Sequence, residues 1–149
     1  IVELIGYKDS KLYEIDRLKK AAWFTQEGKQ WLSSKKSMPD LFSVERTYEI
    51  KDFDGLAQDK QTDVLNRIYL QNIFHQILLA LTVYECDIDY IVEEDKVKIV
   101  DPHTGRIKEG SRWEHGLHTA IEIKEKVKVQ DDFDGMAVIS LKNYFKLYH

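Results

Sequence analysis

The sequence has 149 residues, of which 43% are hydrophobic and 32% are charged, and its formal net charge is −4 at pH 7. This length fits one domain, and the balance of residue types is typical of a globular protein rather than a disordered one. A net negative charge gives no general attraction to nucleic acid, so we expect no nucleic-acid partner. No apolar run approaches the ~18 residues that a membrane-spanning helix needs.

The two ends of the sequence indicate a piece of a longer protein. The chain begins without methionine, and Tyr148-His149 reads as a helix cut in mid-course. The apolar opening, Ile1–Tyr7, is short and quickly followed by charges, so we expect no signal peptide. Cys86 is the single cysteine and cannot form an internal disulfide, which suits a reducing cytoplasm.

The first elements that the sequence predicts are a β-hairpin and a helix. Leu12–Asp16 alternates, Arg17–Lys20 can turn, and Ala21–Phe24 returns as a second strand. Thr25 is a plausible N-cap for a helix that runs through Leu32, with an acidic residue in its first turn.

A long central helix follows an irregular stretch. Ser33–Pro39 is a polar break, and Leu41–Gln61 shows no clear period, so we expect a loop with at most short elements. From Thr62 to Tyr84 apolar residues recur at helical spacings, and they are numerous enough to imply burial on more than one side.

The second half predicts another hairpin, a helix and a strand. Tyr90–Val92 and Val97–Val100 flank the charged turn Glu93–Lys96, and β-branched residues dominate both arms. Asp101–Arg106 must leave the sheet because Pro102 lacks a ladder donor.

Beyond the hairpin, Arg112–Glu125 reads as an amphipathic helix with Trp113 on its apolar face. Val127–Val129 reads as a short strand, and Val138–Tyr148 as a strand or helix start followed by a helical stretch. We therefore expect an α+β fold, with several helices around the long central one and short antiparallel hairpins; a mainly α fold is the alternative.

Three short motifs partly match known ligand-binding patterns, and each lacks a residue or a spacing that the pattern requires. Gly105–Ser111 has the glycine spacing of a phosphate-binding loop but lacks its lysine, so we read it as a connection from hairpin to helix. Asp-Phe-Asp-Gly occurs at Asp52–Gly55 and Asp132–Gly135, where the closing glutamate of a calcium loop is missing, so both read as turns. His103, His115 and His118 match no metal signature, and a metal site there is an alternative to ordinary hydrogen bonding.

A family resemblance begins at the second hairpin. Asp89–Val92 and Val97–Arg106 closely resemble a hallmark of the SecA family, which reads Asp-Tyr-Ile-Val, a short acidic turn, then Val-Ile-Val-Asp-Glu-His/Phe-Thr-Gly-Arg. Gly110–Glu125 is similar to the family's Gly-Arg-Arg-Trp-Ser-Asp-Gly-Leu-His-Gln-Ala-Val-Glu-Ala-Lys-Glu. Ile139–Tyr148 looks like Ile-Thr-Phe-Gln-Asn-Tyr-Phe-Arg-Leu-Tyr, and Phe24–Gly28 more weakly like Leu-Thr-Glu-Arg-Gly.

The sequence also departs from that pattern. Pro102 stands where Glu is usual, Ser111 replaces Arg, and Lys142 and Lys146 replace Gln and Arg. These departures suggest a divergent or accessory member of the family.

The resemblance implies the preprotein cross-linking domain of an ATP-driven protein-export motor. On this reading, residues 1–132 form the substrate-binding domain, which clamps unfolded or signal-peptide-bearing preprotein, and residues 133–149 begin the return into the first nucleotide-binding domain. The piece itself would have no catalytic activity and no cofactor, whereas ATP and Mg²⁺ would bind elsewhere in the parent ATPase. Implied partners are preproteins, signal peptides, the Sec channel and the other motor domains, in a parent that can form a homodimer. The implied location is the cytoplasm, peripheral at the inner face of the bacterial membrane.

Candidate binding residues follow from that reading together with residue chemistry. An extended substrate offers the same amides and carbonyls whatever its sequence, so strand addition suits a tolerant binder. The resemblance implies that a two-stranded stem joins this domain to the first nucleotide-binding domain, and we expect the second strand of that stem at Ile123–Val129. Arg106 and Arg112 are candidates for interdomain contacts, or they tie down their loop, and Trp113 either packs in the core or lines a substrate groove. The residues that we expect to border preprotein are Ile123, Lys124, Lys126, Val127, Lys128, Val129 and Trp113.

Two other functions compete with this one. The chain could be an interaction module that docks on the channel or the motor domains without touching substrate. It could also be a small metal-dependent enzyme built on the histidine cluster. For the stretch Ile123–Val129, the rival interpretation is an ordinary strand whose lysines protect its edge from aggregation.

Overall fold

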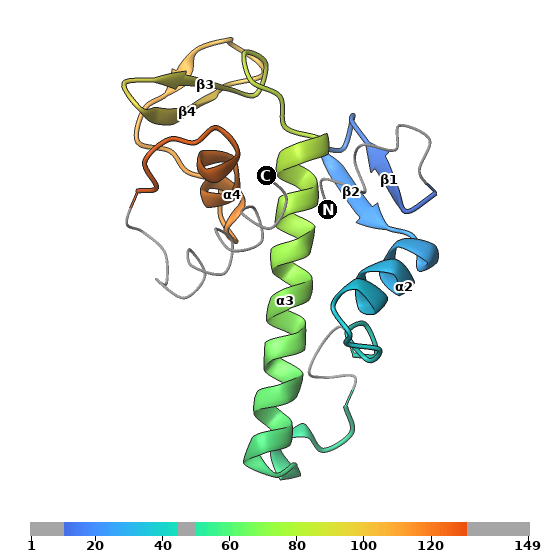
Figure 1. Ribbon diagram of the computed structural model, residues 1–149. Coiled ribbons are helices and arrows are strands. Elements are labelled where there is room, and N and C mark those ends of the chain that lie inside the picture. Colours follow the sequence, from blue (N-terminus) through green and yellow to red (C-terminus); the bar gives the residue numbers. More distant parts are fainter. Residues whose placement is uncertain (1–10, 45–49, 131–149) are drawn as a thin grey trace.

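One long helix, α3 (Gln58–Thr82), organises the fold. The computed structural model describes residues 11–44 and 50–130. In Figure 1, α3 runs as a column through the molecule, with β1, β2 and α2 on one side and α4 and the β3–β4 hairpin on the other. The fold is α+β, as predicted: helices and two small antiparallel sheets share the described part of the chain.

The first hairpin and its helix are confirmed. β1 (Tyr13–Asp16) pairs antiparallel with β2 (Ala21–Phe24), and α2 (Gln26–Lys35) follows directly. Thr25 is the N-cap, as predicted, because its hydroxyl accepts a hydrogen bond from the backbone N–H of Gly28 at 3.2 Å. A Cβ at Gly28 would lie 1.9 Å from the carbonyl oxygen of Leu12, so only glycine lets α2 approach the hairpin this closely.

Helix α3 begins four residues earlier than the predicted Thr62. The short helix η2 (Phe53–Gly55) precedes it, and the side-chain amide of Gln61 donates to the carbonyls of Phe53, Asp54 and Leu56 at 3.2, 3.2 and 3.1 Å. The first Asp-Phe-Asp-Gly motif is therefore a turn, as expected. The C-terminal half of α3 is buried, and the helix packs against β2 and α4, which explains the excess of apolar residues.

The second sheet contains one strand more than the sequence predicted. Its strands, in the order β3-β4-β5, are Tyr90–Glu93, Lys96–Val100 and Ile107–Lys108. The chain leaves the sheet at Pro102, as expected, but returns as β5 because Asp101 closes the loop. Its carboxylate accepts from the backbone N–H of His103 at 2.8 Å and its own N–H donates to the carbonyl of Arg106 at 2.8 Å.

Helix α4 (Leu117–Lys124) is shorter than the predicted helix from Arg112 to Glu125. His115 and Gly116 have φ values of 59° and 88°, which are left-handed and cannot continue a helix. Trp113 therefore precedes the helix and reaches the core from a loop. The largest fully buried side chains are Tyr90, Phe74, Leu32, Leu41, Leu78, Ile121, His118, Glu122 and Thr119.

Some predictions lie outside the described residues. These are the stretch Val138–Tyr148, the turn at Asp132–Gly135, and the return segment at residues 133–149.

Candidate functional site

The predicted strand at Ile123–Val129 is wrong. Ile123 and Lys124 end helix α4, Lys126 lies in a turn with φ 59°, and residues 127–130 have no regular structure. The N–H of Lys126 donates to the carbonyl of Ile123 at 3.1 Å, and that of Val127 to Glu122 at 3.1 Å. This is the hydrogen-bond pattern of a Schellman helix end, in which an apolar residue just after the left-handed position packs back on the helix. Val127 is that residue, and its alternation with Val129 imitated a strand.

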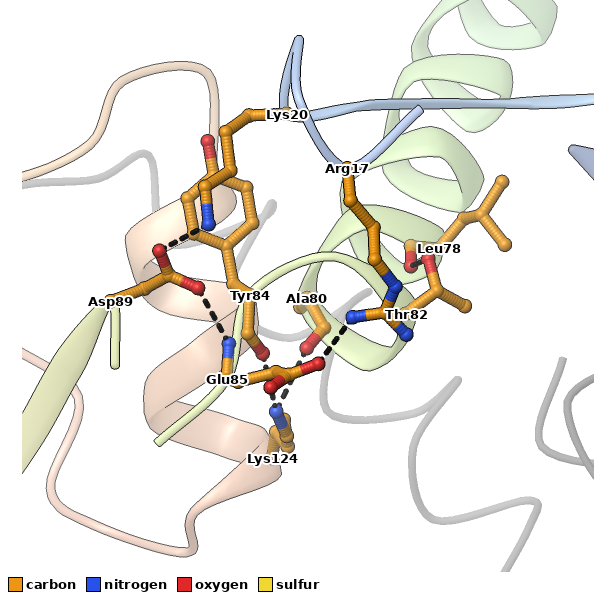
Figure 2. A network of polar contacts seen from close by, with 9 residues as sticks. All are labelled: Arg17, Lys20, Leu78, Ala80, Thr82, Tyr84, Glu85, Asp89 and Lys124. Carbon is orange, nitrogen blue, oxygen red and sulfur yellow. Dashed lines mark hydrogen bonds and ion pairs between the residues drawn. The ribbon is translucent and has the colours of Figure 1, made fainter. Parts of the chain in front are cut away.

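Lys124 stabilises the end of another helix. Its Nζ donates to the carbonyl oxygens of Ala80 at 2.9 Å and Tyr84 at 3.0 Å, which belong to the last turn of α3 and the residues after it (Figure 2). The ammonium also lies 5.4 Å from the centre of the Tyr90 ring. Burial lowers the pKa of Lys124, while nearby carboxylates oppose that shift. Lys124 is thus bound to two main-chain carbonyls inside the domain.

Around Lys124, polar side chains join three parts of the fold. The carboxylate of Asp89 accepts from the N–H of Glu85 at 2.9 Å and from Lys20 of the β1–β2 turn. Arg17 of the same turn forms an ion pair with Glu85 (Figure 2). We call this set of residues, Arg17, Lys20, Glu85, Asp89 and Lys124, the junction. It fixes the first hairpin to the C-terminal end of α3 and to the strand that follows.

Trp113 is partly buried and packs against the core, which is one of the two roles considered for it. Its ring is edge-on to Tyr84 at 4.9 Å and to Tyr90 at 6.2 Å, and it lies 5.5 Å from the ring of His118. Aromatic pairs in this geometry stabilise a core beyond the area they bury. Trp113 therefore holds the loop before α4 against the end of α3.

Arg112 is bound within the domain. Its guanidinium donates to the two carboxylate oxygens of Glu122 at 2.9 and 3.3 Å, and Glu122 is fully buried. A buried carboxylate needs such a partner, because an unpaired charge there is costly. Arg112 thus ties down its loop, the second role that the sequence left open. Arg106 is exposed in the loop 101–106.

His118 is buried beside this ion pair. The Trp113 N–H donates to its Nδ1 at 3.4 Å, and its Nε2 lies 3.7 Å from the Glu122 carboxylate. Burial, followed by the charge of Arg112, lowers the pKa of His118 to about 4. The imidazole is consequently neutral at pH 7. It forms part of the floor of an open cleft of about 380 Å³ between β4, the loop after β5, and α4.

The histidines do not gather around a metal. His118 is buried in α4, whereas His115 and His103 are exposed in separate loops. Within residues 11–44 and 50–130, no three His, Cys, Asp or Glu side chains come together as a metal site. In the same ranges, no helix has the length and apolar character needed to cross a bilayer.

An exposed apolar surface on the first hairpin was missed by the sequence analysis. Leu18 is 98% exposed and Trp23 is 46% exposed. Trp23 lines two open grooves, one of about 690 Å³ along β1 and its turn and one of about 660 Å³ between β2 and α3. The sequence contains the features that indicate this surface. Leu18 interrupts a charged turn, and Trp23 lies opposite Glu14 on the polar face of the hairpin.

Comparison with known proteins places this fold in a family. The model of the SecA preprotein cross-linking domain matches residues 4–122. The chain is 37% identical over 150 residues to the protein translocase subunit SecA of Amoebophilus asiaticus, covering 93% of this chain and 13% of that protein. It is 34% identical over 149 residues to that of Cytophaga hutchinsonii, covering 92% and 13%. A match to that of Salinibacter ruber is 52% identical over 73 residues, covering 49% and 6%.

The chain therefore spans only a small part of the length of these relatives. The match to the family model extends over both sheets and α2, α3 and most of α4, so it includes the hairpin surface and every junction residue except Lys124. The chain belongs to the SecA family and contains its preprotein cross-linking domain.

Proposed function

We propose that this chain is the preprotein-binding part of a SecA-type, ATP-driven translocase. It holds unfolded or signal-peptide-bearing polypeptide and performs no chemical turnover itself. The observation that carries this proposal is the match of the preprotein cross-linking domain over residues 4–122, on a chain 34–37% identical to translocase subunits over more than nine-tenths of its length.

The surface of the domain supports this role. Trp23 lies between two open grooves, and Leu18, beside it, is almost fully exposed. Exposed aromatic and aliphatic side chains in shallow grooves bind apolar segments without demanding a particular sequence. A translocase must accept many substrates, so broad and weak contacts suit it better than a deep pocket.

The rest of the machinery belongs to the longer protein. The relatives are nearly eight times as long as this chain, since the aligned part of it covers 13% of their length. We place ATP and Mg²⁺ in those other parts, and propose the Sec channel and the motor domains as partners at the inner face of the membrane. Residues 1–132 would be the inserted domain and residues 133–149 the start of its return segment.

The structure reduces the set of residues that we propose to contact preprotein. Lys126 and Lys128 are exposed, and they stay candidates for the preprotein path together with partly buried Val129. The other four predicted residues make contacts within the domain. Lys124 donates to main-chain carbonyls, Trp113 packs on Tyr84, and Ile123 and Val127 pack against the core. Arg106 stays a candidate for contact with a neighbouring domain.

A peptide titration tests the proposal. The isotope-labelled 149-residue chain is titrated with a signal-like peptide, a leucine-alanine segment with lysines at both ends, and followed by NMR. We expect fast-exchange shifts with a Kd between about 10 μM and 1 mM, because an open surface gives modest affinity. As a control, the peptide is replaced by a stably folded protein that has the same net charge as the peptide. This protein should cause no shifts. Absence of shifts at about 2 mM peptide would refute the proposed function.

A further inference from the structure

The first Asp-Phe-Asp-Gly motif, Asp52–Gly55, contains a chemically reactive pair of residues that the proposed function does not use. An aspartate followed by glycine can close into a succinimide ring, because glycine has no Cβ to hinder attack by its main-chain nitrogen. In this step the nitrogen of Gly55 bonds to Cγ of Asp54. The amide proton and the carboxyl hydroxyl leave together as one molecule of water.

The ring opens again when water adds to either of its two carbonyls. Addition at the side-chain carbonyl breaks the new bond and restores aspartate. Addition at the main-chain carbonyl breaks the original peptide bond, and Asp54 is then joined to Gly55 through its side chain, as isoaspartate. The water lost in the first step returns in the second, so the reaction needs no oxidant, cofactor or second substrate.

The turn η2 keeps the nitrogen of Gly55 from attacking. Its N–H donates to the carbonyl of Asp52 at 3.1 Å, and this hydrogen bond must break before the nitrogen can react. A Cβ at Gly55 would lie 2.3 Å from Oδ2 of Asp52, so this carboxylate lies directly beside the glycine. Its negative charge disfavours the negative charge that develops as the nitrogen loses its proton. Both contacts therefore slow the closure of the ring.

Gln61, one turn into α3, holds the main chain on both sides of the reactive pair. Its side-chain amide donates to the carbonyls of Phe53 and Asp54 at 3.2 Å and to that of Leu56 at 3.1 Å. The amide has two N–H groups, so it supplies about two full hydrogen bonds to these three acceptors. Ring closure requires the carbonyl of Asp54 to rotate, and the bond from Gln61 opposes that rotation.

Burial gives the pair no protection. Asp54 and Gly55 are both exposed to solvent. Figure 1 shows this turn at the N-terminal end of α3, away from both sheets. Exposed turns with few apolar contacts open locally at a low cost in free energy. The hydrogen bonds of the turn therefore decide how often the pair can react.

We propose that Asp54–Gly55 is a site of isoaspartate formation, which Gln61 protects by holding η2 closed. When η2 opens, the pair forms the ring at the rate of an unfolded chain. Isoaspartate adds one atom to the main chain, so the turn cannot close again and the start of α3 loses the contacts of Gln61. This inference does not depend on the proposed function.

Ageing of the unaltered chain tests the protection. The chain and a synthetic peptide of residues 51–57, which is too short to fold, are incubated at the same temperature and pH. Isoaspartate at Asp54 is measured by digestion and by mass spectrometry with fragmentation that distinguishes the two isomers. We expect it to form at least about 10-fold more slowly in the chain, because the hydrogen bonds of η2 must break first. Equal rates would overturn the inference.

Replacing Gln61 tests its role. Gln61→Leu should raise the rate about 5- to 30-fold, and no further than that of the peptide, because about two hydrogen bonds are lost at a site that water reaches. Gln58→Leu is the matched control, since it removes the same amide from the exposed first residue of α3 and should leave the rate unchanged. Equal rates for these two variants, with helix content intact by circular dichroism, would overturn the role of Gln61. Gln61→Glu, which has the same shape and no donor when ionised, decides the question if the leucine variant unfolds.

The second copy of the motif provides a reference within the same sample. Asp132–Gly135 has the same four residues, and isoaspartate at Asp134 is measured in the same digest. Gln61→Leu should raise the rate at Asp54 and leave the rate at Asp134 unchanged. A parallel increase at both aspartates would show a general loss of stability and would contradict a specific role for Gln61.

Discussion

Replacing Lys124 with methionine distinguishes its structural role from the binding role predicted for it. Methionine keeps the length and apolar stem of lysine and removes only the ammonium group. The carbonyls of Ala80 and Tyr84 would then lose the donor that lies 2.9 and 3.0 Å away. Lys126 is exposed two residues further along, so Lys126→Met is a matched control that removes the same charge.

The expected loss follows from the contacts. A buried acceptor left without a partner costs about 1–3 kcal/mol, and a cation near a helix C-terminus adds about 0.3–1 kcal/mol. Water reaches part of the site, because 23% of the Lys124 side chain is exposed, and relief of the desolvation of the ammonium offsets a further part. We therefore expect Lys124→Met to lower the free energy of unfolding by about 2 kcal/mol.

Urea unfolding followed by circular dichroism measures this loss. With an m-value of about 2 kcal/mol per molar urea, the midpoint should fall by about 1 M for Lys124→Met. For Lys126→Met it should move by less than about 0.3 M, as for an ordinary surface substitution. Equal midpoints for the two variants would show that the ammonium of Lys124 contributes nothing to the junction.

The other predictions concern acid stability, the buried ion pair and the helix cap. The pKa of His118 is lowered to about 4, against about 6.5 when unfolded, so stability is complete above pH 6.5 and falls by about 3 kcal/mol as the pH drops to 4. Urea midpoints from pH 8 to 4 check this, and His118→Asn should lose that part of the pH dependence; an unchanged profile would contradict it. Arg112→Met removes the guanidinium partner of the buried Glu122 carboxylate and should cost about 3–5 kcal/mol, whereas Arg112→Met combined with Glu122→Leu should recover most of the loss in the same urea assay. Thr25→Ala should lower the thermal midpoint by the equivalent of about 1 kcal/mol because the cap to α2 is lost, whereas Thr25→Ser should keep it; equal losses would argue against the cap.

Elements whose signals are local could be predicted from the sequence. The hairpin at Leu12–Phe24 has alternation on both arms and a charged turn between them, and the cap at Thr25 needs only a hydroxyl three residues before an amide. The long helix was recognised from its 3.6-residue period. The hairpin around Glu94-Asp95 could also be predicted, because a short charged turn joins two strands that are rich in β-branched residues.

The candidate site depended on contacts between distant residues. Val127 and Val129 alternate like strand residues, but the chain there closes helix α4, because Val127 packs back on the core. Lys124 resembles a surface lysine in sequence, and only the approach of α4 to the end of α3 gives it two carbonyls to bind. Similarly, Arg112 meets Glu122 ten residues away because the chain turns at Gly116.

The sequence by itself determined the α+β class, the order of the main elements and the family, because periodicity, turn chemistry and ordered motifs are properties of neighbouring residues. The tertiary structure alone decided which lysines are bound and which are exposed, and which strand of the first hairpin lies against the long helix. Those properties depend on which element packs against which: α3 packs against β2, where Nε2 of His75 lies 2.8 Å from the carbonyl oxygen of Ala22.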